Sequence, residues 1–122
     1  MKKLKTKYFS KWARKSRIND DQLLNASQEL DAGLFAANLG GNLYKVRIAG
    51  QSSGKSSGFR TIIAYRKDDR LLYLYGFAKN ERDNIDSKEL ESLKKLSKDY
   101  LSLSLSELER AIKIGILVEL EQ

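Results

Sequence analysis

Five basic side chains occupy positions from which they could act together on a phosphate group. Lys45 and Arg47 alternate along the apolar run "LYKVRI". Arg60 stands near the start of "FRTIIAYR", and Lys79 and Arg82 follow "LLYLYGFA". If the three runs form neighbouring antiparallel strands, these cations converge across the sheet. Crowded like charges repel one another unless an anion neutralises them, so the pattern indicates either a phosphate-binding site or solvated cations on an exposed face.

Cations of this kind suit the cleavage of RNA by its own 2′-hydroxyl group. That reaction requires the hydroxyl to lose a proton, the dianionic phosphorane to be stabilised and the leaving 5′ oxygen to be protonated. Arg and Lys stabilise the phosphorane because they place positive charge where negative charge develops. The chain has no His, so the candidate proton acceptors are Lys45 and Lys79, whose pKa neighbouring Arg residues would lower.

Metal-dependent chemistry finds no support in the sequence. There is no Cys and no His, and no carboxylate cluster has the spacing of metal ligands. A metal nuclease is therefore not expected. Neither a metal ion nor any other cofactor is predicted for the site.

The elements that must position the cations are strands. Strict alternation from Leu43 to Ile48 places the two cations of this run on one face and apolar side chains on the other. Residues 59–66 and 71–78 have the β-branched and aromatic composition of two further strands. The pair Asp68-Asp69 between them is typical of a tight hairpin turn. The sequence therefore predicts a three-stranded antiparallel meander.

Two helices are expected before this meander. A short first strand over residues 3–9 leads into a basic helix in "SKWARKSRI", whose Trp12 is expected to belong to the core. Asn19, with Gln22 three residues on, predicts the start of a second helix, which Gly33 and the turn "NLGGN" should end. No internal repeat or linker interrupts the chain.

Further helices are expected after the meander. Asp86 or Ser87 should begin one helix, and Ser104 with Glu107 forms the capping box of another. The segment "LSLSL" at 101–105 alternates like a strand and lies between them, so its structure is ambiguous; "ILVEL" should close a last strand. The predicted fold class is α+β, a small antiparallel β-sheet with helices packed on it, in a single domain over residues 1–122.

A phosphate-loop motif in the chain is better explained otherwise. The stretch "AGQSSGKS", from Ala49 to Ser56, fits a relaxed version of the motif and follows a strand. A phosphate loop works because the N-terminus of a following helix helps to hold the phosphates, whereas here another strand should follow. We therefore expect no nucleotide cofactor. The loop is interpreted as a hairpin connection whose Lys55 reaches toward RNA.

The distribution of charge indicates a polyanionic or acidic partner. The net charge is +7, and the N-terminal region before Asn19 contains no acidic residue. Its Lys11, Arg14, Lys15 and Arg17 are candidate RNA-binding or ribosome-binding residues. The start lacks the apolar stretch of a secretory signal, and no run of about 18 apolar residues would span a membrane. The cytoplasm is the expected compartment, with no membrane association.

Several stretches together resemble one family of small bacterial proteins. The stretch "GFRTIIAYRKDDRLLYLYGFAKNERDNI", with "FSKWARKSRI" and "DAGLFAANLGGNLYKVRIA", is similar to RelE-type toxins of toxin–antitoxin modules, especially the branch carrying "FAKNERDNI". The resemblance covers nearly the whole chain. It implies an α+β toxin that cuts messenger RNA on the translating ribosome. It also implies a cognate antitoxin encoded beside the toxin, in this branch often a helix-turn-helix protein.

The resemblance also implies site residues. The basic positions that RelE toxins use match Lys45, Arg47, Arg60, Lys79 and Arg82, with Arg60, Lys79 and Arg82 on the scissile phosphate and the other two assisting.

Two positions depart from the family pattern. This chain has Asn80 where the family has an arginine, and Asp86 where it has a tyrosine implicated in proton transfer. Lys79 or Arg82 could replace the arginine, and Tyr75 is a possible substitute for the tyrosine.

Two other functions are compatible with the same sequence. Relatives of the ParE type share the fold and inhibit DNA gyrase by binding it, without catalysis. A basic domain that binds RNA and cuts nothing is a third possibility, and its binding would depend strongly on salt. Because fold does not determine function, the cations at the site favour the nuclease, whereas the two departures weaken it.

Overall fold

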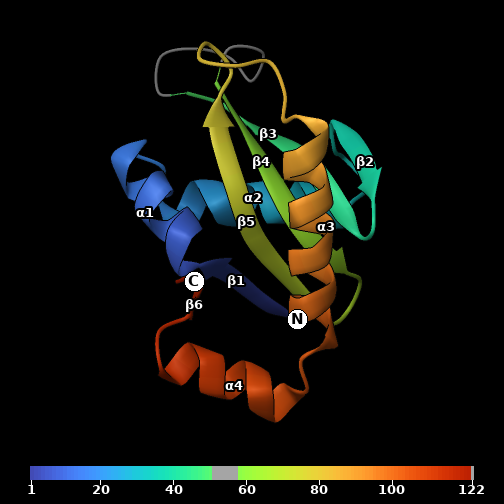
Figure 1. The fold of residues 1–122 in the computed structure, drawn as a ribbon. Helices are drawn as coiled ribbons and strands as arrows, with labels where there is room; N and C mark the ends of the chain where they lie inside the picture. Colours follow the sequence, from blue (N-terminus) through green and yellow to red (C-terminus); the bar gives the residue numbers. More distant parts are fainter. Residues whose placement is uncertain (51–57, 122) are drawn as a thin grey trace.

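A mixed six-stranded sheet forms the centre of the molecule (Figure 1). The computed structural model describes residues 1–50 and 58–121. In the described part of the chain the strand order is β2-β3-β4-β5-β1-β6. The strands are β1 (Lys2–Thr6), β2 (Ala37–Gly40), β3 (Leu43–Ile48), β4 (Phe59–Arg66), β5 (Arg70–Ala78) and β6 (Leu117–Glu119). The predicted α+β class is confirmed.

The sheet is not wholly antiparallel, and on this point the prediction was wrong. The predicted meander of β3, β4 and β5 is present, and the turn after β4 places Asp68 at a φ of 62°. However, β1 pairs with β5 in parallel, and β6 pairs with β1. Parallel neighbours cannot be joined by a short turn, so this pairing has no local signature in the sequence. Pairing of β2 with β3, inside the predicted "NLGGN" turn, was also missed.

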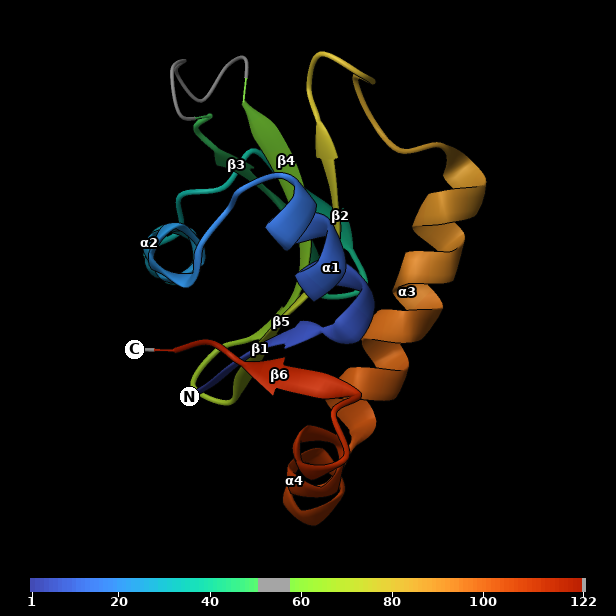
Figure 2. The same ribbon diagram turned by 90° about the vertical axis from the view of Figure 1, so that its left-hand side faces the viewer.

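Helices cover both faces of the sheet (Figure 2). On one face α1 packs on β5 and α2 packs on β3, whereas α3 covers β4 and β5 from the other face. The last helix, α4, lies beyond the end of the sheet and contacts β6. The helices are α1 (Lys7–Lys15), α2 (Asp20–Asp31), α3 (Ser87–Ser102) and α4 (Leu105–Lys113).

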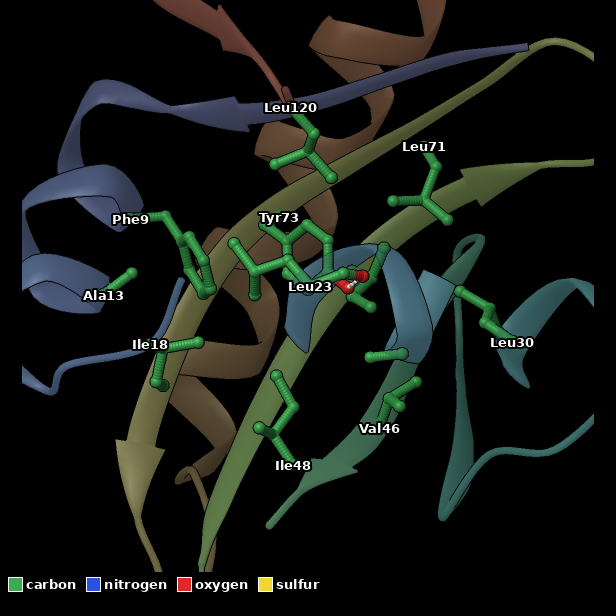
Figure 3. Close-up of a cluster of buried hydrophobic side chains, with 12 residues drawn as sticks. Phe9, Ala13, Ile18, Leu23, Leu30, Val46, Ile48, Leu71, Tyr73 and Leu120 are labelled. Carbon is green, nitrogen blue, oxygen red and sulfur yellow. Dashed lines mark hydrogen bonds between the residues drawn. The ribbon is translucent and has the colours of Figure 1, made fainter. Parts of the chain in front are cut away.

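Two apolar clusters fill the space between these layers. Figure 3 shows the first cluster, in which Phe9, Ile18 and Leu23 of the N-terminal helical region pack on the sheet beside Tyr73. The buried Tyr73 hydroxyl donates a 2.6 Å hydrogen bond to the backbone carbonyl of Leu23, which satisfies its polar atom. The second cluster lies on the opposite face, beneath α3 and α4. Helices on both faces explain why β5 is apolar along most of its length.

The predicted helix starts are largely confirmed. Asn19, Asp86 and Ser104 each close a capping box with the residue three positions on. The ambiguous "LSLSL" segment is the end of α3, a two-residue connection and the first residue of α4. By contrast, the first strand ends at Thr6, earlier than predicted, because its side chain accepts a 3.0 Å hydrogen bond from the Phe9 amide and caps α1.

The buried Arg70 side chain links the C-terminal end of α3 to the β4–β5 hairpin by hydrogen bonds. The Arg70 Nη1 atom donates to the carbonyls of Tyr100 and Leu103 at 3.1 and 2.7 Å, and its Nε donates to Asp69 at 3.1 Å. The side chain of Arg70 is 4% exposed, whereas that of Arg66, which binds Asp69 as well, is 48% exposed. Arg70 therefore satisfies carbonyls that a helix end leaves without partners.

Replacing this arginine should destabilise the fold strongly. We expect Arg70→Ala to lower the free energy of unfolding by about 3 kcal/mol, because buried acceptors lose a charged donor. The exposed neighbour provides the control, and Arg66→Ala should cost about 1 kcal/mol or less. Urea unfolding followed by circular dichroism measures both values. Equal losses for the two variants would show that burial of Arg70 is not what stabilises this contact.

Candidate active site

Strand register brings three of the predicted cations together on one face of the sheet. Arg47 of β3 lies directly opposite Arg60 of β4, and Lys45 lies opposite Ile62. Alternate residues of a strand share a face, so Lys45 and Arg47 lie on the same face of the sheet as Ile62 and Arg60. Ile62 belongs to the second apolar cluster, which lies on the face that α3 covers. The three positive charges therefore occupy adjacent positions beyond the end of that cluster.

This arrangement lowers the pKa of Lys45. Its pKa is lowered, first by burial and then by the positive charges of Arg60 and Arg47. The charge of Lys79 contributes in the same direction, so Lys79 lies close enough to Lys45 to act on it electrostatically. The lowered pKa that the sequence suggested for Lys45 is thus present. A lysine in this state carries its neutral amine at lower pH than an ordinary lysine does.

Arg60 is the most enclosed cation of the group. It is 5% exposed, and its pKa is lowered by burial and then by Arg47. One of its side-chain nitrogens, Nη1, donates a 3.3 Å hydrogen bond to the carbonyl of Phe59. A guanidinium held in this way has little freedom to move, and it remains charged because its intrinsic pKa is very high. It is a preorganised positive group at the site.

Arg82 has a different environment from these cations. Its Nη1 atom donates a 2.9 Å hydrogen bond to Oε2 of Glu89 on α3, and its Nη2 atom donates to Oε1 of the same carboxylate. Nη1 also donates to the Tyr75 hydroxyl at 3.2 Å. Its guanidinium carbon lies 5.5 Å from the centre of the Phe77 ring. The neighbouring Asp83 binds Lys79 instead of Arg82, with 2.8 Å between Lys79 Nζ and Asp83 Oδ1.

Glu89 is the residue of this region that the sequence prediction missed. Its side chain also accepts a 2.9 Å hydrogen bond from the backbone amide of Asp86, as part of the capping box of α3. The Arg82 guanidinium, followed by that amide, lowers the pKa of Glu89 to about 2. A D-x-x-E spacing is typical of a capping box. It does not indicate that the same carboxylate binds Arg82.

The two departures from the family pattern lie at the edge of the site. Asp86 is the N-cap residue of α3, and its side chain accepts a 2.8 Å hydrogen bond from the Glu89 amide. Asn80 is exposed in the turn after β5. The Tyr75 hydroxyl donates to Glu89 at 3.2 Å, and burial, followed by the Glu89 charge, raises the pKa of Tyr75. A raised pKa makes Tyr75 a poor proton acceptor and leaves Lys45 as the better candidate.

The basic N-terminal residues form a separate surface. Lys11, Arg14 and Lys15 are exposed on α1, and Arg17 follows it, on the face of the sheet opposite α3. Trp12 belongs to the core as predicted, for it packs edge-on against Phe59 and lies directly over Gly76 of β5. A Cβ atom at Gly76 would lie 2.3 Å from the Trp12 ring, so only glycine fits there.

Other sequence predictions concern the loop and bound ions. Lys55 lies outside the described residues. The segment after the phosphate-loop-like motif enters strand β4, not a helix, so the helix that the motif requires does not follow. Within residues 1–50 and 58–121, no group of three or more His, Cys, Asp or Glu side chains could hold a metal ion. No helix in that part of the chain is long and apolar enough to cross a membrane.

Comparison with known families assigns the chain. A family model described as the RelE toxin of the RelE / RelB toxin-antitoxin system matches residues 1–120. The chain belongs to the RelE toxin family. A search of curated proteins finds no matching relative. Membership makes the protein a toxin of a toxin–antitoxin system and implies a cognate antitoxin partner.

Proposed function

We propose that this RelE-family chain, acting as one toxin domain in the cytoplasm, is a metal-independent endoribonuclease that cleaves messenger RNA on the translating ribosome. The observation that carries the proposal is the position of Lys45 on the same face as Arg47 and Arg60, where burial and then the neighbouring positive charges lower its pKa. The Lys45 amine loses its proton more readily than an ordinary lysine does, and it lies beside the guanidinium groups of Arg47 and Arg60, which stay charged. Cleavage by the 2′-hydroxyl requires that combination.

Each cation has a definite task in the proposed reaction. The neutral amine of Lys45 takes the proton of the 2′-hydroxyl, whose oxygen attacks the phosphorus. Arg47 and Arg60 donate hydrogen bonds to the non-bridging oxygens and stabilise the phosphorane. The ammonium of Lys79 gives a proton to the leaving 5′ oxygen. The products are a 2′,3′-cyclic phosphate and a 5′-hydroxyl, and no metal ion or other cofactor takes part.

Arg82 acts in this proposal through its neighbours. Because both oxygens of the Glu89 carboxylate bind its guanidinium, less of its charge is available to a phosphate than in Arg60. The pair instead ties the segment that carries Lys79 to the start of α3. Asp86 serves the same segment as a helix cap. Arg82 is therefore a positioning residue, and Asn80 has no assigned role in the chemistry.

The ribosome would hold the messenger RNA in the conformation that this small site needs for cleavage. With Lys45 as its only proposed base, the site depends on a substrate already held in the reactive conformation, and orientation alone is worth several powers of ten in rate. The exposed cations Lys11, Arg14, Lys15 and Arg17, together with Lys55 of the loop, are proposed to contact ribosomal or messenger RNA. The cognate antitoxin, which we propose to be a helix-turn-helix protein, would prevent this docking.

A cell-free translation reaction tests the proposed function. The purified chain is added to it, and new ends of the message are mapped by primer extension, with a ribosome-free reaction as control. The proposal expects ends within the reading frame only while ribosomes translate. An intact message would overturn it. Gyrase supercoiling and salt-dependent RNA binding would then decide between a ParE-like inhibitor and a basic RNA-binding domain.

A further inference from the structure

An apolar pocket lies between the start of α1 and α3, beside β5. Its volume is about 370 Å³, and Tyr8, Tyr75, Tyr100 and Ile116 contribute to its lining. The tyrosines come from α1, β5 and α3, so the packing of these elements brings their rings to one place. A pocket that combines aromatic rings with hydroxyl groups suits a flat ligand with polar edges. A nucleobase has that form.

Strand register places this pocket beside the candidate active site. Phe77 of β5 lies opposite Arg60, and Tyr75 lies opposite Ile62, two residues along both strands. Two residues of a strand span about 7 Å, and alternate residues share a face. The Tyr75 hydroxyl also accepts a hydrogen bond from Arg82. An RNA strand whose scissile phosphate lies at Arg60 therefore brings a neighbouring nucleotide to the pocket.

Tyr8 is the accessible ring of the pocket. It is 62% exposed, whereas Phe77 is 4% exposed and belongs to the interior. The Tyr8 ring lies nearly parallel to that of Tyr75, with an angle of 6° between the ring planes and 6.1 Å between the ring centroids. Aromatic rings that are open to solvent and backed by a second ring are platforms on which unpaired bases stack.

The charge around the pocket favours a nucleic acid as its ligand. Lys7 lies in the lining, and among the described residues the lining includes no Asp or Glu. Lys11, Arg14 and Lys15 follow Lys7 on α1, a helix without acidic residues. Cations attract the phosphate backbone whatever its sequence, and aromatic rings bind the bases. The two together are the means by which proteins bind single-stranded RNA.

We propose that this pocket is a nucleobase-binding subsite, in which an unpaired base next to the scissile phosphate stacks on Tyr8. The inference rests on the proposed cleavage of RNA and adds to it a residue that holds the substrate. Lys7 contacts a phosphate beside the stacked base. Anchoring that base fixes which bond of the strand lies at Arg60. Because bases differ in stacking strength, the nucleotide in the pocket contributes to the sequence preference of the cut.

Fluorescence anisotropy with two labelled single-stranded oligoribonucleotides tests the subsite. Both have the same length and 2′-O-methyl groups that prevent cleavage, but one carries its bases and the other is abasic. Tyr8→Ala should raise the Kd of the base-bearing strand by about 10-fold and change that of the abasic strand by less than about twofold. Tyr8→Phe keeps the ring and should bind both strands as the wild type does.

A matched control removes an exposed aromatic ring elsewhere. Phe35 is 41% exposed and does not line the pocket, so Phe35→Ala should bind both strands with wild-type affinity. The wild type itself should bind the base-bearing strand more tightly than the abasic strand, a comparison that requires no variant to fold. Melting temperatures show which variants are folded.

The two strands separate stacking from charge. Equal losses on both strands in folded Tyr8→Ala, or no loss on the base-bearing strand, would overturn the subsite. Equal affinity of the wild type for the two strands would overturn it as well. Loss of antitoxin binding with unchanged RNA binding would overturn it and assign the pocket to a protein partner. The assay contains no ribosome and cuts no RNA, so message cleavage in the translation reaction is judged separately.

Discussion

Arg60→Ala should reduce the rate of message cleavage by about 100-fold to 1000-fold, the usual cost of removing one preorganised group that stabilises developing charge. Arg60 is the most buried of the three cations that β3 and β4 bring together, and a hydrogen bond to the Phe59 carbonyl restrains its guanidinium. A mobile surface cation could not replace it. The rate is measured as the appearance of cleaved message in cell-free translation with excess toxin.

The conservative and the remote variants make this result interpretable. Arg60→Lys keeps the charge but loses the planar donor fork, so it should recover only part of the lost rate. Lys67→Ala removes a cation from the exposed turn after β4 and should cleave like the wild type. Melting temperatures within a few degrees of the wild type would exclude loss of folding. If folded Arg60→Ala cleaves at more than about a tenth of the normal rate, Arg60 does not stabilise the transition state.

Lys45→Arg should reduce cleavage by about 100-fold or more while it retains the positive charge. The neutral lysine is the proposed base, so the wild-type rate should rise with pH until Lys45 is deprotonated and should then level off. Burial, followed by the charges of the neighbouring Arg residues, lowers the pKa of Lys45, which moves that rise to lower pH than an ordinary lysine would give. Arginine stays protonated throughout, so the variant should lose this rise.

The measurement is the rate of cleavage across the pH range in which translation remains active. Lys67→Arg, the same substitution at an exposed position away from the site, is the control for effects of pH on the ribosome. It should follow the wild-type profile. If Lys45→Arg instead keeps the wild-type rate and its dependence on pH, Lys45 serves as a fixed positive charge and another group removes the proton.

The parts of the fold that local patterns determine could be predicted from the sequence. The meander was visible because alternation, β-branched residues and a turn pair are all local features. Candidate capping residues, namely Asn19, Asp86 or Ser87, and Ser104, marked the starts of three helices for the same reason. The parallel pairing of β1 with β5 depends on residues far apart in the chain, so no local pattern revealed it. The start of α1 was misplaced because Thr6, a good strand residue, also serves as its cap.

The candidate active site, like the fold, could be predicted from the sequence only where local patterns determine it. Convergence of Lys45, Arg47 and Arg60 followed from alternation along two strands that were correctly paired. The environment of Arg82 did not, because its partner Glu89 comes from α3, and only the packing of that helix on the sheet brings the two together. The apolar pocket that Tyr8, Tyr75, Tyr100 and Ile116 help to line could not be predicted either, because these residues come from α1, β5, α3 and the residue before β6.

The chemical nature of the cut ends tests the central claim most directly. If Lys45 and the neighbouring arginines drive attack by the 2′-hydroxyl, message fragments made during translation will carry a 2′,3′-cyclic phosphate or the 3′-phosphate derived from it. The downstream fragment will carry a 5′-hydroxyl that polynucleotide kinase labels without prior phosphatase treatment. Fragments with a 5′-phosphate and a 3′-hydroxyl would contradict the account, because water and not the 2′-hydroxyl would then have attacked the phosphorus.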